Sequence, residues 1–343
     1  MRARLKRLLP YVGYVLFYFV TFCLCCYLTF PYDRLRDRVV AEFHASQKGQ
    51  AKQNHLEIDE VGPYRLTGLV ATGVKYITPG TPKPDGTESP TTLEIDELRA
   101  RLSIFPLLVG RKSVSFYARA FGGEMEGQFS DAAKERKLEL EMKDVSIGRI
   151  EPITSLVGLP LTGAIKGTVE MTFPDKRVSK ATGAVKLSVL DLSAGDGKAK
   201  IADTIALPKL QVGELVVEAD VKDGVLKLNK LGAQGQDLDL ASEGKLTLRD
   251  QPLESVADIY VRFKFSDGFR GKSDITKSLF GAPGSTTPAL FEFNPKVKQS
   301  KRTDGFYGWH MVGQLLNARF DAFSGPVPGG AVVKPATAAP KGF

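Results

Sequence analysis

Residues that commonly carry chemistry are scarce in this chain of 343 residues, which has three cysteines, three histidines and one tryptophan. All three cysteines lie between residues 23 and 26, so the rest of the chain has no thiol and forms no disulfide. The histidines stand at positions 44, 55 and 310 and do not share the spacing of metal ligands. We therefore predict no metal site and no cofactor.

No catalytic constellation stands out either. Ser242 to Lys245 match the Ser-x-x-Lys pattern of some acyl enzymes, but they lie between alternating apolar residues, as in a hairpin. Gly271-Lys272-Ser273 resemble the end of a phosphate-binding loop, yet Ser266 stands where its first glycine should be. No nucleophile, base and orienting group can be assembled. We predict that the protein is not an enzyme and has no catalytic residue.

Acidic residues are absent from both ends of the chain. Of the formal net charge of +8, residues 1–30 contribute +4 and residues 326–343 contribute +2, so residues 31–325 carry only +2. Nucleic-acid binding requires a basic patch that neutralises phosphates. The nearly neutral body of the chain offers no such patch, and we predict no nucleic-acid partner.

The N-terminus does have one long uncharged run, the 23 residues from Leu8 to Phe30. A membrane-spanning helix needs about 20 apolar residues to cross ~30 Å of hydrocarbon. The alternative is a cleaved signal peptide, whose apolar region is shorter and ends in a small-residue cleavage site that this run lacks. We predict an uncleaved transmembrane helix over residues 8–30, with Leu8 and Phe30 at its flanks.

The basic N-terminus sets the orientation of this helix. Residues 1–7 carry four positive charges and no acid, which keeps this end in the cytoplasm. The body then lies across the membrane, and its lack of thiols suits an oxidising compartment such as the bacterial periplasm. We predict a single-pass inner-membrane protein with a periplasmic β-rich domain over residues 31–325 and a disordered tail over residues 326–343.

A helix is expected directly after the anchor. Leu35, Val39 and Phe43 repeat at i, i+4 and i+8, with charged residues elsewhere. Gly49 is expected to end it. Such a helix lies either at the membrane surface or against the start of a sheet, and we favour the second position.

From Leu56 to Phe320 the apolar residues mostly alternate with polar ones. This period indicates antiparallel strands with one apolar and one solvated face. Turn residues interrupt the alternation, as at Gly122-Gly123 and Asp223-Gly224. We predict a mainly β fold: a single N-terminal transmembrane helix followed by a long, curved or twisted, mostly antiparallel β-sheet with short peripheral helices.

The apolar face of such a sheet is the candidate binding surface. Its clearest positions, taken from two alternating runs, are Ile165, Val169, Met171, Val261, Phe263 and Phe265. A sheet buries such a face by closing into a barrel, by stacking as a sandwich, by curling around an apolar ligand or by docking on a partner. The periodicity leaves open whether the face is open to lipid or covered by the protein itself.

Two interruptions fall between residues 93 and 112. Leu93 and Ile95 share one alternating frame while Leu98 and Ala100 share the other, so we expect a β-bulge at Asp96-Glu97. The next feature is the apolar segment around residue 106, where a proline is expected to end the strand. Residues 107–109 are then expected to fold back over the sheet as an apolar plug.

Four stretches carry a family resemblance through their order in the chain: the anchor, the helix after it, residues 93–127 (LEIDELRARLSIFPLLVGRKSVSFYARAFGGEMEG) and residues 306–323 (FYGWHMVGQLLNARFDAF). They resemble the type II secretion system protein N family, in its form related to AsmA-like proteins. Residues 107–112 stand where that family has a Leu-Leu-x-Gly-basic plug. Residues 313–320 look like its closing strand, with Ala318 in place of a proline.

The resemblance implies an inner-membrane-anchored periplasmic component of the type II protein secretion system, a non-enzymatic protein that binds other secretion-system proteins. The alternative that it implies is an AsmA-like envelope protein that binds or conducts phospholipid through an apolar β-groove. We favour the secretion role, because a dozen strands about 4.8 Å apart extend only ~60 Å, which is short for a conduit across the periplasm.

Overall fold

The computed structural model describes residues 13–15, 17–22, 24–25, 27–47, 54–65, 67–78, 91–108, 110–151, 153, 159–196, 200–201, 205–206, 208–251, 254–285 and 289–325. The chain divides into two units, residues 1–104 and residues 105–343, and each is described by itself. The predicted cytoplasmic segment over residues 1–7 and the predicted tail over residues 326–343 lie outside the described residues.

The predicted transmembrane helix is described only in part, because residues 8–12, 16, 23 and 26 lie outside the described residues. Its described residues from 13 to 28 are helical, and apolar side chains such as Phe17 and Leu28 are exposed. Within the part of the chain that the structure describes, no helix combines the length and the apolar character needed to cross a membrane. The anchor therefore stays a prediction.

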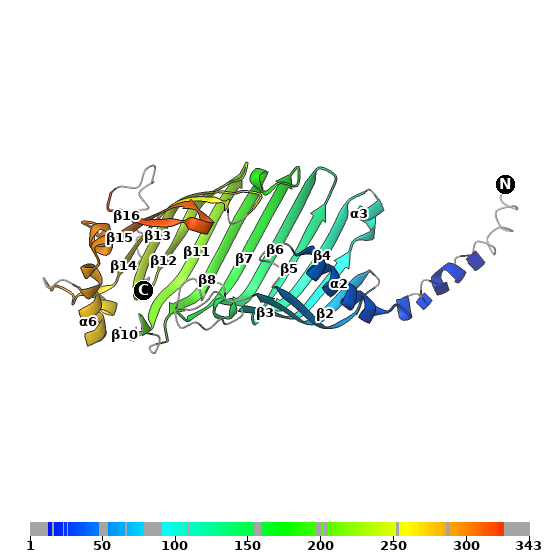
Figure 1. The fold of residues 1–343 in the computed structure, drawn as a ribbon, viewed down its shortest axis with the longest axis horizontal. Helices are drawn as coiled ribbons and strands as arrows, with labels where there is room; N and C mark the ends of the chain where they lie inside the picture. Colours follow the sequence, from blue (N-terminus) through cyan, green and yellow to red (C-terminus); the bar gives the residue numbers. More distant parts are fainter. Residues whose placement is uncertain are drawn as a thin grey trace, which may run out of the picture. The chain divides into compact units, whose positions relative to one another are not determined.

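The first unit continues with one helix and three strands (Figure 1), which are α2 (Tyr32–Ser46), β1 (His55–Tyr64), β2 (Gly68–Thr78) and β3 (Thr91–Leu102). The strands pair antiparallel, β1 with β2 and β2 with β3. The guanidinium of Arg36 in α2 donates to the carbonyl of Asp59 in β1 over 3.1 Å, and the rings of Phe43 and Tyr76 lie 5.9 Å apart. The helix therefore packs against this sheet.

One residue of the predicted helical stripe faces away from the sheet. Leu35 and Phe43 are half-buried, but Val39 is 43% exposed, and Val40 takes the inner position. Residues 36, 40 and 43 follow the i, i+4, i+7 spacing, which keeps side chains on one side of a helix with 3.6 residues per turn better than a strict four-residue repeat does.

The bulge predicted at Asp96-Glu97 is wrong. β2 and β3 keep a single register from the Gly68–Arg101 pair to the Thr78–Thr91 pair, with no residue inserted at Asp96 or Glu97. The irregular backbone lies in β2 instead, at Gly73, whose φ is +61° and where a Cβ would come within 1.9 Å of the Asp59 carboxylate. Because the register is unbroken, Ile95 and Leu98 face opposite sides, and the two halves of β3 present their apolar side chains to different faces.

The second unit is built on eleven strands, which are β4 (Lys112–Ala120), β5 (Gly123–Asp131), β6 (Glu135–Ser146), β7 (Leu161–Pro174), β8 (Thr182–Ala194), β11 (Leu210–Lys222), β12 (Val225–Gln234), β13 (Leu238–Thr247), β14 (Val256–Phe265), β15 (Tyr307–Gln314) and β16 (Arg319–Ala322). They lie side by side in this order (Figure 1), each antiparallel to the next. β9 (Lys200–Ile201) and β10 (Ile205–Ala206) form a separate pair. Among the described strands β4 and β16 do not pair, so this sheet is open.

Short helices accompany these strands, namely α3 (Ile104–Leu108), η2 (Ile147–Arg149), η3 (Val178–Lys180), α5 (Asp267–Arg270), α6 (Asp274–Phe280), η5 (Leu290–Phe293), α7 (Pro295–Ser300) and η6 (Leu315–Asn317). The predicted turns fall between β4 and β5 and between β11 and β12. The prediction of a mainly β, antiparallel fold with short helices is confirmed for the described residues.

The described side chains of the turn after β3 are largely exposed. In α3, Ile104 is 53% exposed, Phe105 is 85% exposed and Leu107 is 43% exposed. The helix closes at Gly110, whose N–H donates to the Leu107 carbonyl over 3.0 Å. Of the predicted plug, residues 107–109, Leu107 is exposed, so the expectation is wrong for this side chain, whereas the side chain of Leu108 and all of Val109 lie outside the described residues.

A glycine in the middle of the second unit permits two strands to approach closely. Gly167 in β7 has a φ of +143°, and a Cβ there would lie 2.1 Å from the Lys186 carbonyl of β8. Any other residue would push these strands apart or strain the backbone.

Candidate functional site

Cross-strand pairing collects the apolar side chains of the second unit into four rows, which we name the apolar face. The first row is Val145, Ile165, Val189, Leu215, Ala233, Leu240, Phe263 and Tyr307. The second row is Ala118, Met125, Met142, Gly167, Leu187, Val217, Leu231, Ser242, Val261, Trp309 and Ala322.

The other two rows lie farther along the strands. The third row is Phe116, Gly127, Leu140, Val169, Val185, Ala219, Leu228, Gly244, Ile259, Met311 and Phe320. The fourth row is Val114, Phe129, Leu138, Met171, Gly183, Val221, Leu226, Leu246, Ala257 and Gly313. With strands about 4.8 Å apart and about 3.3 Å of rise per residue, the face extends roughly 50 Å along the sheet and ~20 Å across it.

The six residues predicted from the sequence all lie on this side of the sheet. Ile165 and Phe263 belong to the first row, Val261 to the second, Val169 to the third and Met171 to the fourth, and Phe265 follows two residues after Phe263 on β14. Ile165 is buried in a cluster with Val189 and Leu161. The structure thus brings the two predicted runs together on one face, although β8, β11, β12 and β13 separate them.

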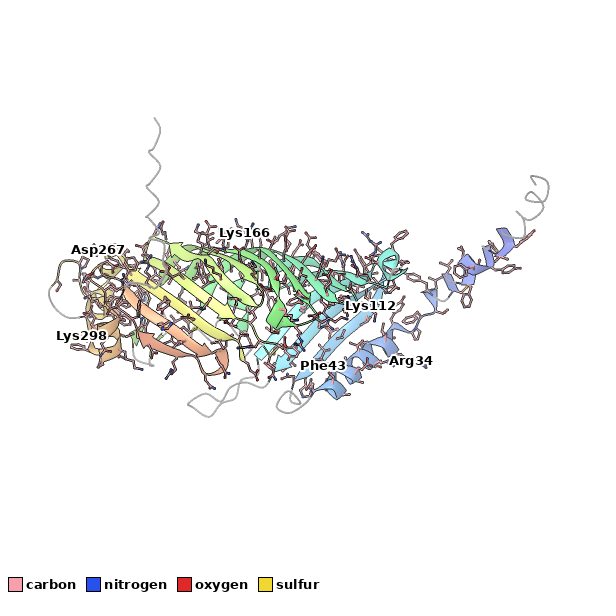
Figure 2. The ribbon with its side chains drawn as sticks, turned by 90° about the horizontal axis from the view of Figure 1, so that it is seen from above. Arg34, Phe43, Lys112, Lys166, Asp267 and Lys298 are labelled. Carbon is pink, nitrogen blue, oxygen red and sulfur yellow. The ribbon has the colours of Figure 1, made fainter. Side chains whose placement is uncertain are left out.

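Burial divides the apolar face into a covered end and an open middle. Its first row joins a buried cluster that includes Ile147 of η2. In the second to fourth rows several large side chains, such as Leu187, Leu231 and Met171, are only half-buried, whereas Val221 and Leu228 are buried. Figure 2 draws the helices near Asp267 and Lys298 at one end of the second unit and no α-helix over its central strands. The middle of the face is therefore partly open to solvent.

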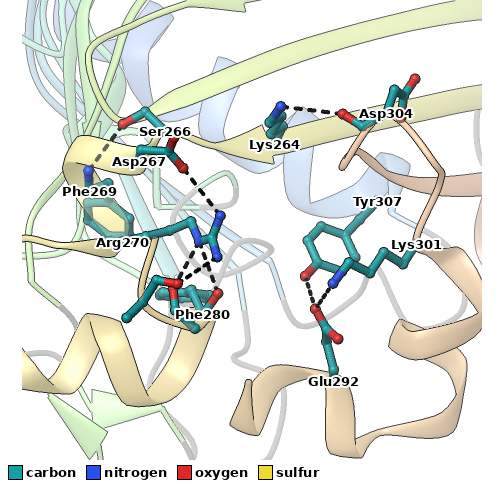
Figure 3. Close-up of polar contacts among 12 residues, drawn as sticks. Lys264, Ser266, Asp267, Phe269, Arg270, Phe280, Glu292, Lys301, Asp304 and Tyr307 are labelled. Atoms are coloured by element: carbon teal, nitrogen blue, oxygen red, sulfur yellow. Dashed lines mark hydrogen bonds and ion pairs between the residues drawn. The ribbon is translucent and has the colours of Figure 1, made fainter. Parts of the chain in front are cut away.

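Helices α5, α6, η5 and α7 form a cap over one end of β14 and β15. Phe269 of α5 is fully buried, and the Phe265 ring lies 5.6 Å from Phe269 and 4.3 Å from Phe280. The Arg270 guanidinium donates to the carbonyls of Phe280 and Gly281, at 3.2 and 2.9 Å (Figure 3). The cap is thus an aromatic core of its own, held by hydrogen bonds.

A second set of polar contacts ties the cap to β15. Glu292 of η5 accepts a hydrogen bond from the Tyr307 hydroxyl over 2.7 Å and one from Lys301 over 2.6 Å (Figure 3). Burial raises the pKa of Tyr307, and its hydrogen bond to Glu292 raises it further. Burial also opposes ionisation of Glu292, but the hydrogen bonds from Lys301 and Tyr307 outweigh it and lower the pKa of that carboxyl. The carboxylate form therefore stabilises the cap.

The opposite side of the sheet is polar. One of its rows runs through Tyr117, Glu126, Glu141, Thr168, Lys186, Glu218 and Lys230. The Lys143 ammonium lies 2.6 Å from Glu126 and 3.1 Å from Glu141, and hydrogen bonds to these two carboxylates raise the pKa of Lys143 to about 12. This side carries the alternating charges of a solvated surface.

Methionine is concentrated on the apolar face. The chain has five methionines, and Met125, Met142, Met171 and Met311 all stand in its rows. Methionine is unbranched and polarisable, and it adapts to ligands of varied shape. Ser242 is the one aliphatic hydroxyl in the rows, and its Oγ is buried and has no hydrogen-bond partner among the described residues. The face thus offers flexible apolar contacts and almost no polar ones.

Alternation would have indicated several central residues that the six predicted positions omit. Trp309 and Met311 alternate with Gly308 and His310 in β15, which is the pattern used for the other strands. The cap helices also had a signal, since Ser273 forms a capping box with Thr276 at the start of α6. Within the described ranges no three histidine, cysteine or acidic side chains are grouped to hold a metal ion.

Comparison with known proteins adds no relative. No protein-family model matches the chain, and no curated protein and no solved structure matches it at a significant level. The structure itself therefore gives the class of the chain: it is a mainly β protein whose second unit is an open antiparallel sheet with one apolar face.

Proposed function

We propose that this chain is a membrane-anchored envelope protein that binds the acyl chains of phospholipids on its apolar face. The observation that supports this most is the partly open middle of the face, where the mostly apolar second and third rows each cross all eleven strands of the second unit. Soluble proteins seldom leave so large a contiguous apolar surface without a ligand or a partner.

The chemistry of the face favours an acyl chain over a compact ligand. A compact ligand usually meets an enclosed pocket with a few polar groups that fix its orientation. This face has half-buried methionine, leucine and valine side chains and a single aliphatic hydroxyl, that of Ser242. A hydrocarbon chain needs no polar partner, and it gains about 0.8 kcal/mol for each methylene that it buries.

The N-terminus supports the membrane part of the proposal. Described residues of the predicted anchor are helical, and their apolar side chains are exposed, as is expected of side chains that face lipid. The basic residues before it favour a cytoplasmic N-terminus and a periplasmic body at the bacterial inner membrane.

A structural role in type II protein secretion is the second candidate. It is favoured by β16, the four-residue end of the sheet order, which pairs only with β15 among the described strands. An unpaired strand edge can accept a strand from another protein. In this role the partners are other secretion-system proteins, and the apolar face serves packing.

Photocrosslinking in cells distinguishes the two candidates. A photoreactive residue replaces Leu187, in the open middle of the apolar face, or its neighbour Lys186, which is exposed on the polar side. Lipid binding predicts a phospholipid adduct at position 187 and little or none at position 186. Equal adducts at both positions, or none at either, contradict lipid binding on this face.

Deletion of the gene in the native host supplies the complementary test. The lipid role predicts altered envelope lipid composition with normal secretion, and the secretion role predicts the reverse. Restoration by the full chain, but not by a chain that lacks residues 1–30, would show that either role requires the anchor.

A further inference from the structure

The short turn after β3 exposes large apolar side chains to solvent. Phe105, at 85%, is the most exposed of the large apolar side chains among the described residues, and Leu107 is also exposed. We name Phe105, Leu107, Arg111 and Lys112 the α3 tip; all four belong to the second unit.

The backbone of the α3 tip is ordered by its own hydrogen bonds. The Gly110 N–H donates to the Leu107 carbonyl over 3.0 Å, and the Arg111 N–H donates to the Pro106 carbonyl over 2.9 Å. Gly110 has a φ of +74°, which suits the residue that ends a helical turn. The aromatic and aliphatic side chains are therefore displayed by a closed turn and do not depend on a strand or on the apolar face.

Along the chain, the charge next to the α3 tip has one sign; across the β4–β5 pair Lys112 lies opposite Asp131, whose carboxylate is paired with Arg136 and Lys176. From Leu98 to Gly123 the chain has three arginines besides Arg111, one lysine, and no aspartate or glutamate. The side chains of Arg111 and Lys112 are exposed, and neither forms an ion pair within the described part of the chain. A basic pair beside exposed apolar side chains is the combination found in segments that sit at the surface of anionic membranes.

We propose that the α3 tip inserts into the headgroup region of an anionic lipid bilayer. Phe105 and Leu107 enter the apolar boundary of the bilayer, and the cations of Arg111 and Lys112 bind lipid phosphates. This contact is with a bilayer surface, whereas the apolar face takes single acyl chains. The inference therefore does not depend on acyl-chain binding by the apolar face.

The test places tryptophan at the tip of the full chain. Trp309, the single tryptophan of the protein, is replaced by phenylalanine, and Phe105→Trp then provides the signal. The protein is reconstituted in phosphatidylcholine vesicles that also contain phosphatidylglycerol, and is mixed with a second population of the same composition. Brominated lipid is placed in one population or in the other.

The expected result is quenching of tryptophan 105 by brominated lipid, together with protection from iodide in the water. Quenching from the host vesicles places the tip in the bilayer of the anchor, and quenching from the added vesicles places it in a second membrane. The control is Ser115→Trp, on the exposed side of β4, which should remain accessible to iodide. Equal iodide access at 105 and 115 without lipid quenching overturns the proposal, and is also the result if the tip serves a protein partner.

Reversal of the two charges tests whether anionic lipid attracts the α3 tip. Arg111→Glu with Lys112→Glu should weaken the affinity of the tip for the anionic surface by about 25-fold or more and so strongly reduce the lipid quenching of tryptophan 105, since each basic residue near such a surface contributes about fivefold in affinity. Far-UV circular dichroism should be unchanged, because both side chains are exposed. Undiminished quenching would contradict a role for anionic lipid. The proposal would also be contradicted if vesicles of phosphatidylcholine alone gave the same quenching.

Discussion

The two ends of the apolar face have the same kind of side chains but different surroundings. At the first row, Ile165 and Val189 are buried in the cluster that includes Ile147 of η2, whereas in the later rows Leu187 and Val261 remain half-buried. Composition is thus similar along the face, and only the covering elements differ. The difference shows that the short helices cover one end of the face and leave many side chains of the later rows half-exposed.

The largest expected effect comes from placing the same charge in the covered first row and in a half-buried later row. Ile165→Asp should lower the free energy of unfolding by about 4 kcal/mol or more, because a carboxylate enters a buried apolar cluster. Val261→Asp should cost about 1–2 kcal/mol, since water can reach the half-buried position. Urea unfolding of the full chain in mild detergent, followed by circular dichroism, measures both. Equal costs would mean that the middle of the face is covered as well.

The aromatic cap is tested next. Phe269→Ala should cost about 4 kcal/mol, because it removes a fully buried ring from the cap. The matched control is Phe293→Ala in η5, where the ring is 68% exposed and the change should stay within ~0.5 kcal/mol. Similar small losses for both would show that the cap is not a cooperative part of the second unit.

A smaller effect compares the two sides of one strand. Leu187→Asn should cost about 1–2 kcal/mol through lost apolar packing, while Lys186→Asn should stay within ~0.5 kcal/mol on the exposed polar side. Leu187→Asn should also abolish lipid adducts at neighbouring positions of the apolar face. Stability loss at Lys186 that equals that at Leu187 would argue against the assignment of the two faces.

The smallest expected effect is a pH dependence of the cap. The pKa of Glu292 in the folded chain lies below its ordinary value of 4.5. A carboxyl with a lowered pKa stabilises the fold fully above its unfolded pKa, and this contribution is lost as the pH falls through the folded value. Between pH 5 and lower values the parent chain should therefore lose more stability than Glu292→Gln. Parallel losses in both proteins would exclude this carboxylate as the cause.

The period-two alternation was a reliable guide to the second unit. Each strand there packs one face and solvates the other, so its sequence carries the pattern directly. The cap and the α3 tip were not predictable in this way. α5 has four residues and α3 has five, too few to show a helical period, and whether Phe105 turns inward depends on packing that no local pattern records.

The error at Asp96-Glu97 has a related cause. A change of phase in the sequence can mean a bulge, or it can mean that opposite faces are apolar in the two halves of one strand. The second explanation holds for β3. α2 lies against β1 on one side of the first unit, and there Leu93 and Ile95 share a face with Tyr76 and Val74. The sequence pattern is the same in both cases.

The meandering strand order has an evolutionary consequence. Almost every strand of the second unit pairs with its neighbours in sequence, and only the β9–β10 excursion separates β8 from β11. Gain or loss of one hairpin would change the length of the apolar face by about 10 Å without disturbing the cap, because in such arrays each element contacts only those beside it. Length is therefore a trait that this architecture can vary in small, independent steps.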